Sequence, residues 1–330
     1  FASDAAYQQA QGNNPDGTRN PAYEVLLDVP NLIDYMLIVL YGGSRDGPLG
    51  AAGTIPNNFF ALRKRDNSMG FQFFVHDFEH TLLATNENRT GPYTAGSPSG
   101  GGLMRSNPQY LWQQLQQNEN FRMRVADHVH RHFFNGGLLT PQACIARAAA
   151  RTNQLYSPLV AESARWGDAQ RTVPYNRNVD WLANVNLTFT NYFPQRSGIV
   201  LNQLRGKGLY PTVTAPSFNQ HGGEIDAGFA LAMTAPTGLI YYTLDGSDPR
   251  LPGGGVAPAA LVYSGPVTLN ESVLVKSRAL DNGVWSALNE AAFLVRQTFA
   301  ELFITELMYH PPAAGETDGD EFEFIELKNV

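Results

Sequence analysis

The sequence predicts a multidomain α+β protein: a mostly helical domain with one β-hairpin, then a β-sandwich, then the first strands of a further β domain. A length of 330 residues suits two or three domains of roughly 100–200 residues each. Apolar residues recur at helical spacing up to about residue 206, whereas the later chain is rich in Thr, Val, Tyr, Gly and Pro and alternates. We therefore expect domains at 1–206, 207–298 and 299–330.

Composition narrows the class of protein. The net charge is −7, and Lys and Arg form no basic stretch, so a nucleic-acid partner is not expected. The longest apolar runs, such as residues 35–41, are too short to span a membrane. One cysteine excludes a disulfide within the chain. A start at Phe1 and an end at Val330 inside a strand-like pattern predict a fragment of a longer polypeptide.

Helical periodicity dominates the first domain. Residues 23–41 carry apolar side chains at helical spacing, with Pro30 as a first turn or a break, and residues 107–134 predict one or two amphipathic helices. A helix over 140–156 begins with an N-capping Thr140 followed by a proline. Residues 180–204 predict a helix that Pro194 starts or kinks.

The same domain contains one short β unit. Residues 59–65 and 71–76 predict two strands, with a turn at 66–70 between them. A Gly-rich loop over 42–53 precedes the first strand. We expect a hairpin that follows directly on the first long helix and its loop.

The later chain predicts strands throughout. Residues 229–234, 239–244 and 272–280 alternate as half-buried strands do, and Asp-Gly-Ser-Asp-Pro at 245–249 is a turn signal. Short strands at this spacing favour a sandwich. Near the end of the chain, 302–309 and 321–329 are predicted to pair across the loop 311–320.

Two segments combine polar side chains with strongly apolar neighbours. One covers residues 41–47 and continues at 56–60, and the other spans 70–80. Apolar neighbours fix a polar group and exclude water, as a reactive or metal-binding carboxylate requires. On the residues alone Asp77 is the strongest candidate, because a carboxylate at the end of a buried strand is costly to bury without a partner.

These segments supply, in order, Arg45-Asp46, Asn57-Asn58-Phe59, a hairpin and His76-Asp77-Phe78-Glu79. This order resembles the catalytic half of the CotH (spore-coat protein H) kinase-like family, in which an Asp and a following Asn precede a strand that ends in W-D-x-D/E. The segment 70–83 is similar to the F-R-F-F-x-W/H-D-A-E-H-T-L version of large modular bacterial proteins. The resemblance covers about residues 20–205 and implies a kinase-like C-terminal lobe.

The resemblance also implies ATP- and Mg²⁺-dependent transfer of phosphate to Ser or Thr of a protein. Kinases hold Mg²⁺ with a carboxylate and an amide, while a second carboxylate orients the acceptor hydroxyl. By this correspondence Asp46 is the catalytic base, Asn58 and, less favoured, Asn57 bind the cofactor, and Asp77 and Asn58 bind the metal. Glu79 is an extra metal ligand or orients one. The family's nucleotide-binding lobe lies upstream, so the fragment alone is expected to bind ATP poorly.

A transition-metal site is a weaker alternative at the same place. The residues that supply suitable ligand types are His76, Asp77, Glu79 and His80. Neighbouring side chains of a strand point to opposite faces, so only a subset of the four can meet at one ion.

A pair of histidines and the single cysteine are expected to have structural roles. His128 and His132 lie four apart and share a helix face, but Val129 stands where an H-E-x-x-H motif has its glutamate. A packed or surface helix is therefore expected there. Cys144 lies inside a helical run and is expected to be a buried small apolar residue.

Residues 239–250 contain Y-Y-T-L-D-G-S-D-P and resemble the chitobiase/β-hexosaminidase C-terminal module, which has a fibronectin-type-III-like sandwich; residues 273–279 fit a later strand of that module. Residues 302–312 and 320–329 resemble the first two strands of a lamin-tail domain, an immunoglobulin-like sandwich. These resemblances imply a secreted bacterial protein, extracellular or at the cell surface, in which the sandwich is a rigid spacer or, as the less favoured alternative that rests on family association alone, a module that contacts polysaccharide. The acidic loop side chains attract Ca²⁺ or stay solvated; they are Glu316, Asp318, Asp320 and Glu321.

Two functions remain open from the sequence. One is a CotH-type protein kinase-like enzyme that acts on a protein substrate. The alternative is a non-catalytic extracellular or cell-surface scaffold or adhesin, associated with a cell-surface component or with carbohydrate.

Overall fold

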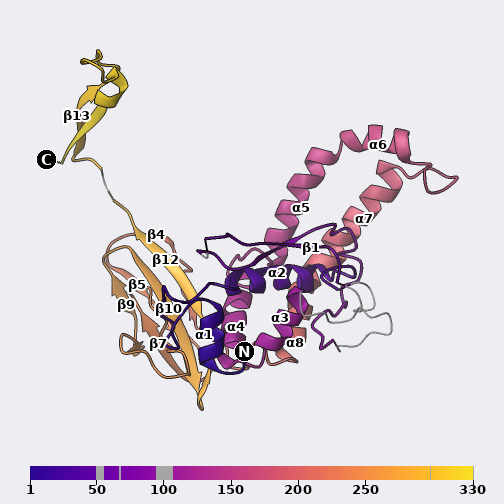
Figure 1. Ribbon diagram of the computed structural model, residues 1–330, viewed down its shortest axis with the longest axis horizontal. Coiled ribbons are helices and arrows are strands. Elements are labelled where there is room, and N and C mark those ends of the chain that lie inside the picture. Colours follow the sequence, from indigo (N-terminus) through magenta and orange to yellow (C-terminus); the bar gives the residue numbers. More distant parts are fainter. Residues whose placement is uncertain (50–55, 67, 94–106, 298, 330) are drawn as a thin grey trace.

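The computed structural model describes residues 1–49, 56–66, 68–93, 107–297 and 299–329. It is an α+β structure, with helices in the first part of the chain and strands from residue 217 onward (Figure 1). The predicted α+β class and β-rich C-terminal region are confirmed. The Gly-rich loop 42–53 is described only as far as residue 49.

The first part contains helices, with a β-hairpin in the long connection between α2 and α3. Their bounds are α1 (Asp4–Ala10), α2 (Val29–Gly42), α3 (Pro108–Leu115), α4 (Glu119–Phe133), α5 (Pro141–Leu155), α6 (Pro158–Trp166), α7 (Leu182–Leu187) and α8 (Phe193–Arg205). Two π-helical turns, η1 (Arg177–Trp181) and η2 (Thr188–Tyr192), flank α7. Helices α5, α6 and α7 extend from the core as an arm (Figure 1).

Helix α2 is the centre of the hydrophobic core. Most of its side chains are buried, and α3, α4 and α8 pack around it. The core side chains that these elements contribute include Leu32, Ile33, Met36, Leu37, Leu40, Trp112, Leu115, Phe121, Val125, Val129, Val200 and Leu204. A helix with so wide an apolar surface is stable only inside such a layer.

Helix α2 begins later than its apolar pattern predicts, at Val29 instead of residue 23. The carboxylate of Asp28 accepts a hydrogen bond from the Asn31 backbone N–H at 3.0 Å and caps the helix. The preceding residues instead pair with the hairpin, where the Phe71 N–H donates to the Leu26 carbonyl at 2.9 Å. Pro30 occupies the first turn, as expected.

The predicted hairpin is present but short. Strands β1 (Phe59–Leu62) and β2 (Gln72–Val75) are antiparallel, with Phe59 opposite Val75 and Leu62 opposite Gln72. The side chain of Asn31 on α2 both donates to and accepts from the backbone of Phe73, at 3.2 and 2.6 Å. The start of α2 therefore fixes where the hairpin lies.

The β-rich region is built from short strands around a second core. They are β3 (Ser217–Phe218), β4 (Gly223–Ile225), β5 (Phe229–Leu231), β6 (Met233–Thr234), β7 (Leu239–Thr243), β8 (Leu261–Val262), β9 (Val267–Leu269), β10 (Val273–Asp281), β11 (Val284–Trp285) and β12 (Asn289–Val295). One sheet has the order β4-β12-β10-β7-β8, with β11 paired to β10, and the ribbons β3–β6 and β5–β9 share its core. All pairs are antiparallel except β4 with β12.

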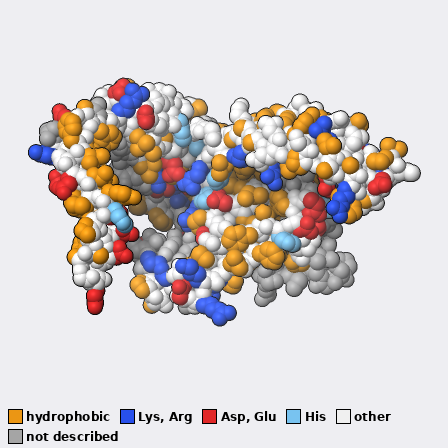
Figure 2. Space-filling view, turned by 90° about the horizontal axis from the view of Figure 1, so that it is seen from above, with side chains coloured by type: hydrophobic (Ala, Val, Ile, Leu, Met, Phe, Trp, Pro, Cys, Tyr) orange, Lys and Arg blue, Asp and Glu red, His pale blue; other side chains and the backbone are white. Residues whose placement is uncertain are grey.

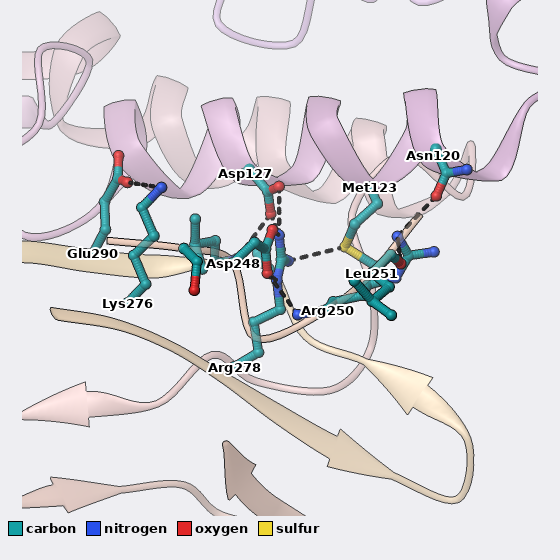
Figure 3. Close-up of polar contacts among 12 residues, drawn as sticks. Asn120, Met123, Asp127, Asp248, Arg250, Leu251, Lys276, Arg278 and Glu290 are labelled. Carbon is teal, nitrogen blue, oxygen red and sulfur yellow. Dashed lines mark hydrogen bonds and ion pairs between the residues drawn. The ribbon is translucent and has the colours of Figure 1, made fainter. Parts of the chain in front are cut away.

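An ionic cluster joins this β module to α4 (Figure 3). Arg278 of β10 is 1% exposed and donates to both oxygens of Asp127 on α4, at 2.8 and 2.7 Å. It also donates to both oxygens of Asp248, at 2.7 and 2.6 Å. Burial alone would lower the pKa of Arg278, but the two carboxylates raise it above its ordinary value.

A second arginine extends this contact. Arg250 donates to the Asn120 side chain at 2.8 Å and to Glu119 at 3.0 Å, both at the start of α4 (Figure 3). Ala287 of the module lies in the core of the helical part. The module is thus fixed on α4 by buried polar contacts as well as by packing.

The last described strands form a hairpin. Strands β13 (Leu302–Met308) and β14 (Phe324–Asn329) pair antiparallel, as expected, and every residue of both is exposed. Figure 1 shows this hairpin apart from the rest of the chain.

The described helices include none that combines the length and the apolar character needed to cross a bilayer, as the sequence predicts. On the face shown in Figure 2, Lys and Arg side chains are scattered among acidic and apolar ones.

Candidate functional site

The candidate site lies where α2 ends. Gly43 adopts φ of 60° and caps the helix in the left-handed conformation. The guanidinium of Arg196 on α8 is fully buried; it donates to the carbonyl of Tyr41 at 2.8 Å and to that of Leu40. It also donates to the carbonyls of Thr85 and Glu87, at 2.6 and 2.9 Å. Arg196 therefore ties the end of α2 to the segment that follows the hairpin.

The loop after α2 is attached to the chain beyond β2. The backbone N–H of Arg45 donates to the carbonyl of His80 at 3.1 Å, and that of Leu82 donates to the carbonyl of Gly42 at 2.8 Å. These two bonds place residues 43–49 beside residues 76–82.

Asp46 is the centre of the site. Its Oδ1 accepts a hydrogen bond from Nδ2 of Asn57 at 3.0 Å, and its Oδ2 accepts one from Nδ2 of Asn58 at 2.9 Å. The Asn58 amide also donates to the backbone carbonyl of Asp77, at 3.2 Å. The structure thus brings together the Asp and the two Asn residues that the sequence singled out, and two amides fix the plane of the carboxylate.

Two residues with left-handed backbone lie at the same place, and others lie elsewhere in the described part of the chain. Asn58 has φ of 50° and Asp77 has φ of 48°, in the left-handed region that side chains rarely adopt. The two residues flank the open end of the hairpin, since Phe59 pairs with Val75. Strained residues gather at functional sites, where the surrounding structure holds them.

The ligand types at the site form one close group. Ligand atoms of Asp46, Glu79 and His80 all lie within 4.8 Å of one another. Nε2 of His80 lies 3.3 Å from Oε1 of Glu79. Among the described residues, Asp77 takes part in this constellation through its backbone carbonyl, and its exposed carboxylate is outside the group.

The predicted roles fit this geometry unequally. Asp46 and Glu79 present carboxylate oxygens to a shared space, as a base and a metal ligand require. Asn58 directs its NH2 group, not its oxygen, at Asp46, so an amide ligand role requires rotation of that side chain. The metal role of Asp77 stays a prediction. Of the four residues proposed for a transition-metal site, Glu79 and His80 have ligand atoms close together. The ring of His76 instead lies against Phe60, at 4.6 Å between centroids.

A cleft of about 380 Å³ begins at Thr81, one residue after His80. Thr81, Leu82, Leu83 and Thr85 line it together with residues of α7 and η2, which include Asn184, Thr188 and Tyr192.

Two other predictions concern residues outside this site. Cys144 is a buried free thiol, as expected. His128 and His132 share a helix face, but that face meets Asp34 of α2, with Asp34 Oδ1 2.6 Å from Nδ1 of His128 and 3.1 Å from Nε2 of His132. Sequence reasoning missed this group because the carboxylate belongs to a helix more than 90 residues earlier.

The acidic loop near the end of the chain contains a short 3-10 turn. Asp318 caps a short 3-10 turn, its carboxylate accepting from the Asp320 N–H at 3.2 Å. Asp320 groups with His310 and Glu323, and all three are exposed. Calcium binding there stays a prediction.

Comparison with known proteins identifies one part of the chain. Residues 229–287 match the sequence profile of the family described as Fn3 associated. This match spans β5 to β11 and supports the predicted fibronectin-III-like module. No match was found among the curated proteins.

Proposed function

We propose that residues 1–206 form the catalytic part of a CotH-type kinase-like domain, which transfers phosphate from ATP to Ser or Thr of a protein. One observation carries this proposal: Asp46 accepts hydrogen bonds from both Asn57 and Asn58 and shares its surroundings with Glu79. The catalytic base of a kinase is a carboxylate held in a fixed orientation near the metal ligands.

In this proposal the carboxylate of Asp46 accepts a hydrogen bond from the Ser or Thr hydroxyl of the protein substrate and thereby orients that hydroxyl. Asn57 and Asn58 occupy one lone-pair direction of each carboxylate oxygen and leave others for the acceptor. The cleft that begins at Thr81 receives the peptide on which that hydroxyl lies.

The residues present fit Mg²⁺ in their chemistry. The carboxylate of Glu79, which lies close to that of Asp46, is a hard oxygen donor of the kind that Mg²⁺ prefers, and we assign Asp77 and Asn58 as the further metal ligands. When bound, Mg²⁺ with ATP neutralises the charge that develops on the transferred phosphate.

The modular context supports an extracellular or cell-surface protein. The Fn3-associated module is followed by the exposed β13–β14 hairpin, which we assign to a lamin-tail domain, and we assign the module itself to the chitobiase type. This arrangement also favours the second candidate function, a non-catalytic scaffold or adhesin that presents the module to a cell-surface component or polysaccharide.

Phosphate transfer by the intact gene product decides between the two functions. With Mg-ATP and a Ser- and Thr-rich acceptor, Asp46→Asn is expected to lower incorporation by about 10²–10⁴-fold, the usual contribution of a general base. Asp77→Ala tests the metal role separately, and Asp168→Asn, at an exposed carboxylate, is the matched control. Equal incorporation by wild type and Asp46→Asn would refute the assigned base, and no incorporation by wild type would favour the scaffold.

A further inference from the structure

A second group of metal-binding side chains lies between α2 and α4. Asp34 lies eight residues before the end of α2, about 12 Å along the helix axis from the loop that carries Asp46. His128 and His132 lie one turn apart on the facing side of α4. The three ligand atoms, one carboxylate oxygen and two imidazole nitrogens, all lie within 4.8 Å of one another.

The burial of the group is typical of a coordination site with one open side. The side chains of His128 and His132 are 8% and 16% exposed, whereas that of Asp34 is 44% exposed. The imidazoles are therefore held in place by the protein, and the carboxylate faces solvent from which an ion can enter.

One oxygen serves both histidines. Oδ1 of Asp34 lies 2.6 Å from Nδ1 of His128 and 3.1 Å from Nε2 of His132. Imidazole nitrogen and carboxylate oxygen bind metals without a proton, so an ion at this place would take the position of the hydrogen-bond protons that these contacts share.

We propose that Asp34, His128 and His132 bind a divalent transition metal of the Zn²⁺ class. Zn²⁺ takes imidazole nitrogen and carboxylate oxygen at about 2.0–2.2 Å in tetrahedral geometry, which separates ligand atoms by about 3.4 Å. The observed separations of 2.6 and 3.1 Å need to widen by less than an ångström. Three protein ligands leave a fourth position for water on the side where Asp34 is exposed.

The consequence of metal binding is a clamp between two helices. Helix α2 leads into the Asp46 loop, and α4 carries Asp127, which holds the β module through Arg278. An ion bound by both helices fixes the candidate site relative to the module. This inference does not depend on the proposed kinase function.

Zinc titration of the whole chain, after removal of metals by a chelator, tests the site in competition with a chromophoric chelator. We expect one tight equivalent, and Co²⁺ in its place should show the intense visible absorption of a tetrahedral N/O site. His132→Gln should weaken binding by more than about 100-fold, beyond the usual loss from an outer-shell partner. His80→Gln and His310→Gln, from the other two groups of metal-binding side chains found among the described residues, are the matched controls.

Thermal unfolding provides a second readout that a misfolded variant cannot imitate. Zn²⁺ should raise the Tm of the wild type, because it binds the folded state alone, and should not raise that of the nearly isosteric Asp34→Asn. Zinc affinity unchanged in His132→Gln, or lost equally in His80→Gln, would overturn the proposal by placing the ion elsewhere. No binding of Zn²⁺ or Co²⁺ by the wild type would show that the group is only an ion pair.

Discussion

Individual buried polar side chains join segments of this protein that are far apart in the sequence. Arg196 on α8 donates to four backbone carbonyls around the end of α2, and Arg278 on β10 binds carboxylates of α4 and of the loop after β7. A buried charge is tolerated only when its hydrogen bonds are satisfied. Each of these residues therefore specifies one arrangement of the segments around it.

His130 on α4 makes the stability of the fold depend on pH. Burial lowers the pKa of His130 to about 4, and its Nδ1 lies 3.0 Å from the hydroxyl of Tyr210. The unfolded chain binds a proton near pH 6.5, whereas the folded chain binds it only near pH 4, so stability falls as pH drops between these values. The loss is on the order of 3 kcal/mol. Urea unfolding at a series of pH values measures it.

His130→Phe is the control for that titration. Phenylalanine keeps the stacking on Phe134, whose ring lies 4.7 Å away, and removes the titrating group. The variant should lose most of the pH dependence between 6.5 and 4. Paired carboxylates such as Asp34 and Asp248 have lowered pKa values, so they change the stability of the fold at more acidic pH than His130 does. The same pH slope in both proteins would rule out His130 as its source.

At the scale of elements, the hairpin is placed by a glycine. A Cβ on Gly70 would lie 2.5 Å from the carbonyl carbon and 2.6 Å from the nitrogen of Leu27. Backbone cannot yield as a flexible side chain does, so Gly70→Ala should cost roughly 1–3 kcal/mol of folding free energy. Strand β1 begins directly after Asn58, and β2 ends two residues before Asp77. A displaced hairpin therefore displaces both residues, and Gly70→Ala should weaken divalent-ion binding at the Asp46 site. Chemical denaturation and Mn²⁺ binding measure the two effects.

Gly198→Ala separates this steric effect from the general effect of adding a methyl group. Gly198 lies inside α8, and a Cβ there meets nothing within 4 Å. Alanine is favoured over glycine in a helix interior by roughly 0.5–1 kcal/mol, so this variant should be more stable than the wild type. A neutral Gly70→Ala would show that the hairpin can move away from Leu27 and the segment that precedes α2.

Most elements were predictable because their signals are local. Periodicity located α2, α4 and α5, and Pro194 does lie in the first turn of α8. The start of α2 was mispredicted because the pairing of Leu26 with Phe71 removes residues that have helical spacing. Helices α1 and α6 were missed, since both are short.

The sequence pointed to Asp46, Asn57 and Asn58, which the structure brings together, but it gave no sign that Asp77 would contribute its backbone carbonyl and not its carboxylate. The order of Asp46, Asn57, Asn58 and Glu79 along the chain carries a recognisable pattern. The direction in which the Asn58 amide points depends on the left-handed backbone at Asn58 and on the carbonyl of Asp77, and no sequence pattern specifies either. The Asp34 group depends in the same way on how two helices meet.

At the scale of the whole molecule, the β module is oriented by its interface with α4. The predicted turn at 245–249 bends so that Asp248 faces Arg278, because Asp245 accepts hydrogen bonds from the backbone and side chain of Ser247 at 2.9 and 2.6 Å. Asp127 on α4 is the second carboxylate that binds Arg278, and it also accepts a hydrogen bond from the backbone N–H of Leu288 at 2.8 Å. The turn is thus part of the domain interface as well as of the module.

Arg278→Met should therefore separate the two parts of the molecule. Removal of one partner of a buried ion pair leaves Asp127 with an uncompensated charge, at a cost of roughly 3–5 kcal/mol. Arg296→Met is the matched control on the same module, because Arg296 is 62% exposed and its pairs with Glu224 and Asp226, at 3.6 Å, are worth about 1 kcal/mol or less. Urea unfolding measures the stability, and small-angle scattering measures whether the module leaves α4. Asp127→Asn combined with Arg278→Met should restore part of the loss, and equal stability of the two arginine variants would mean that packing alone holds the interface.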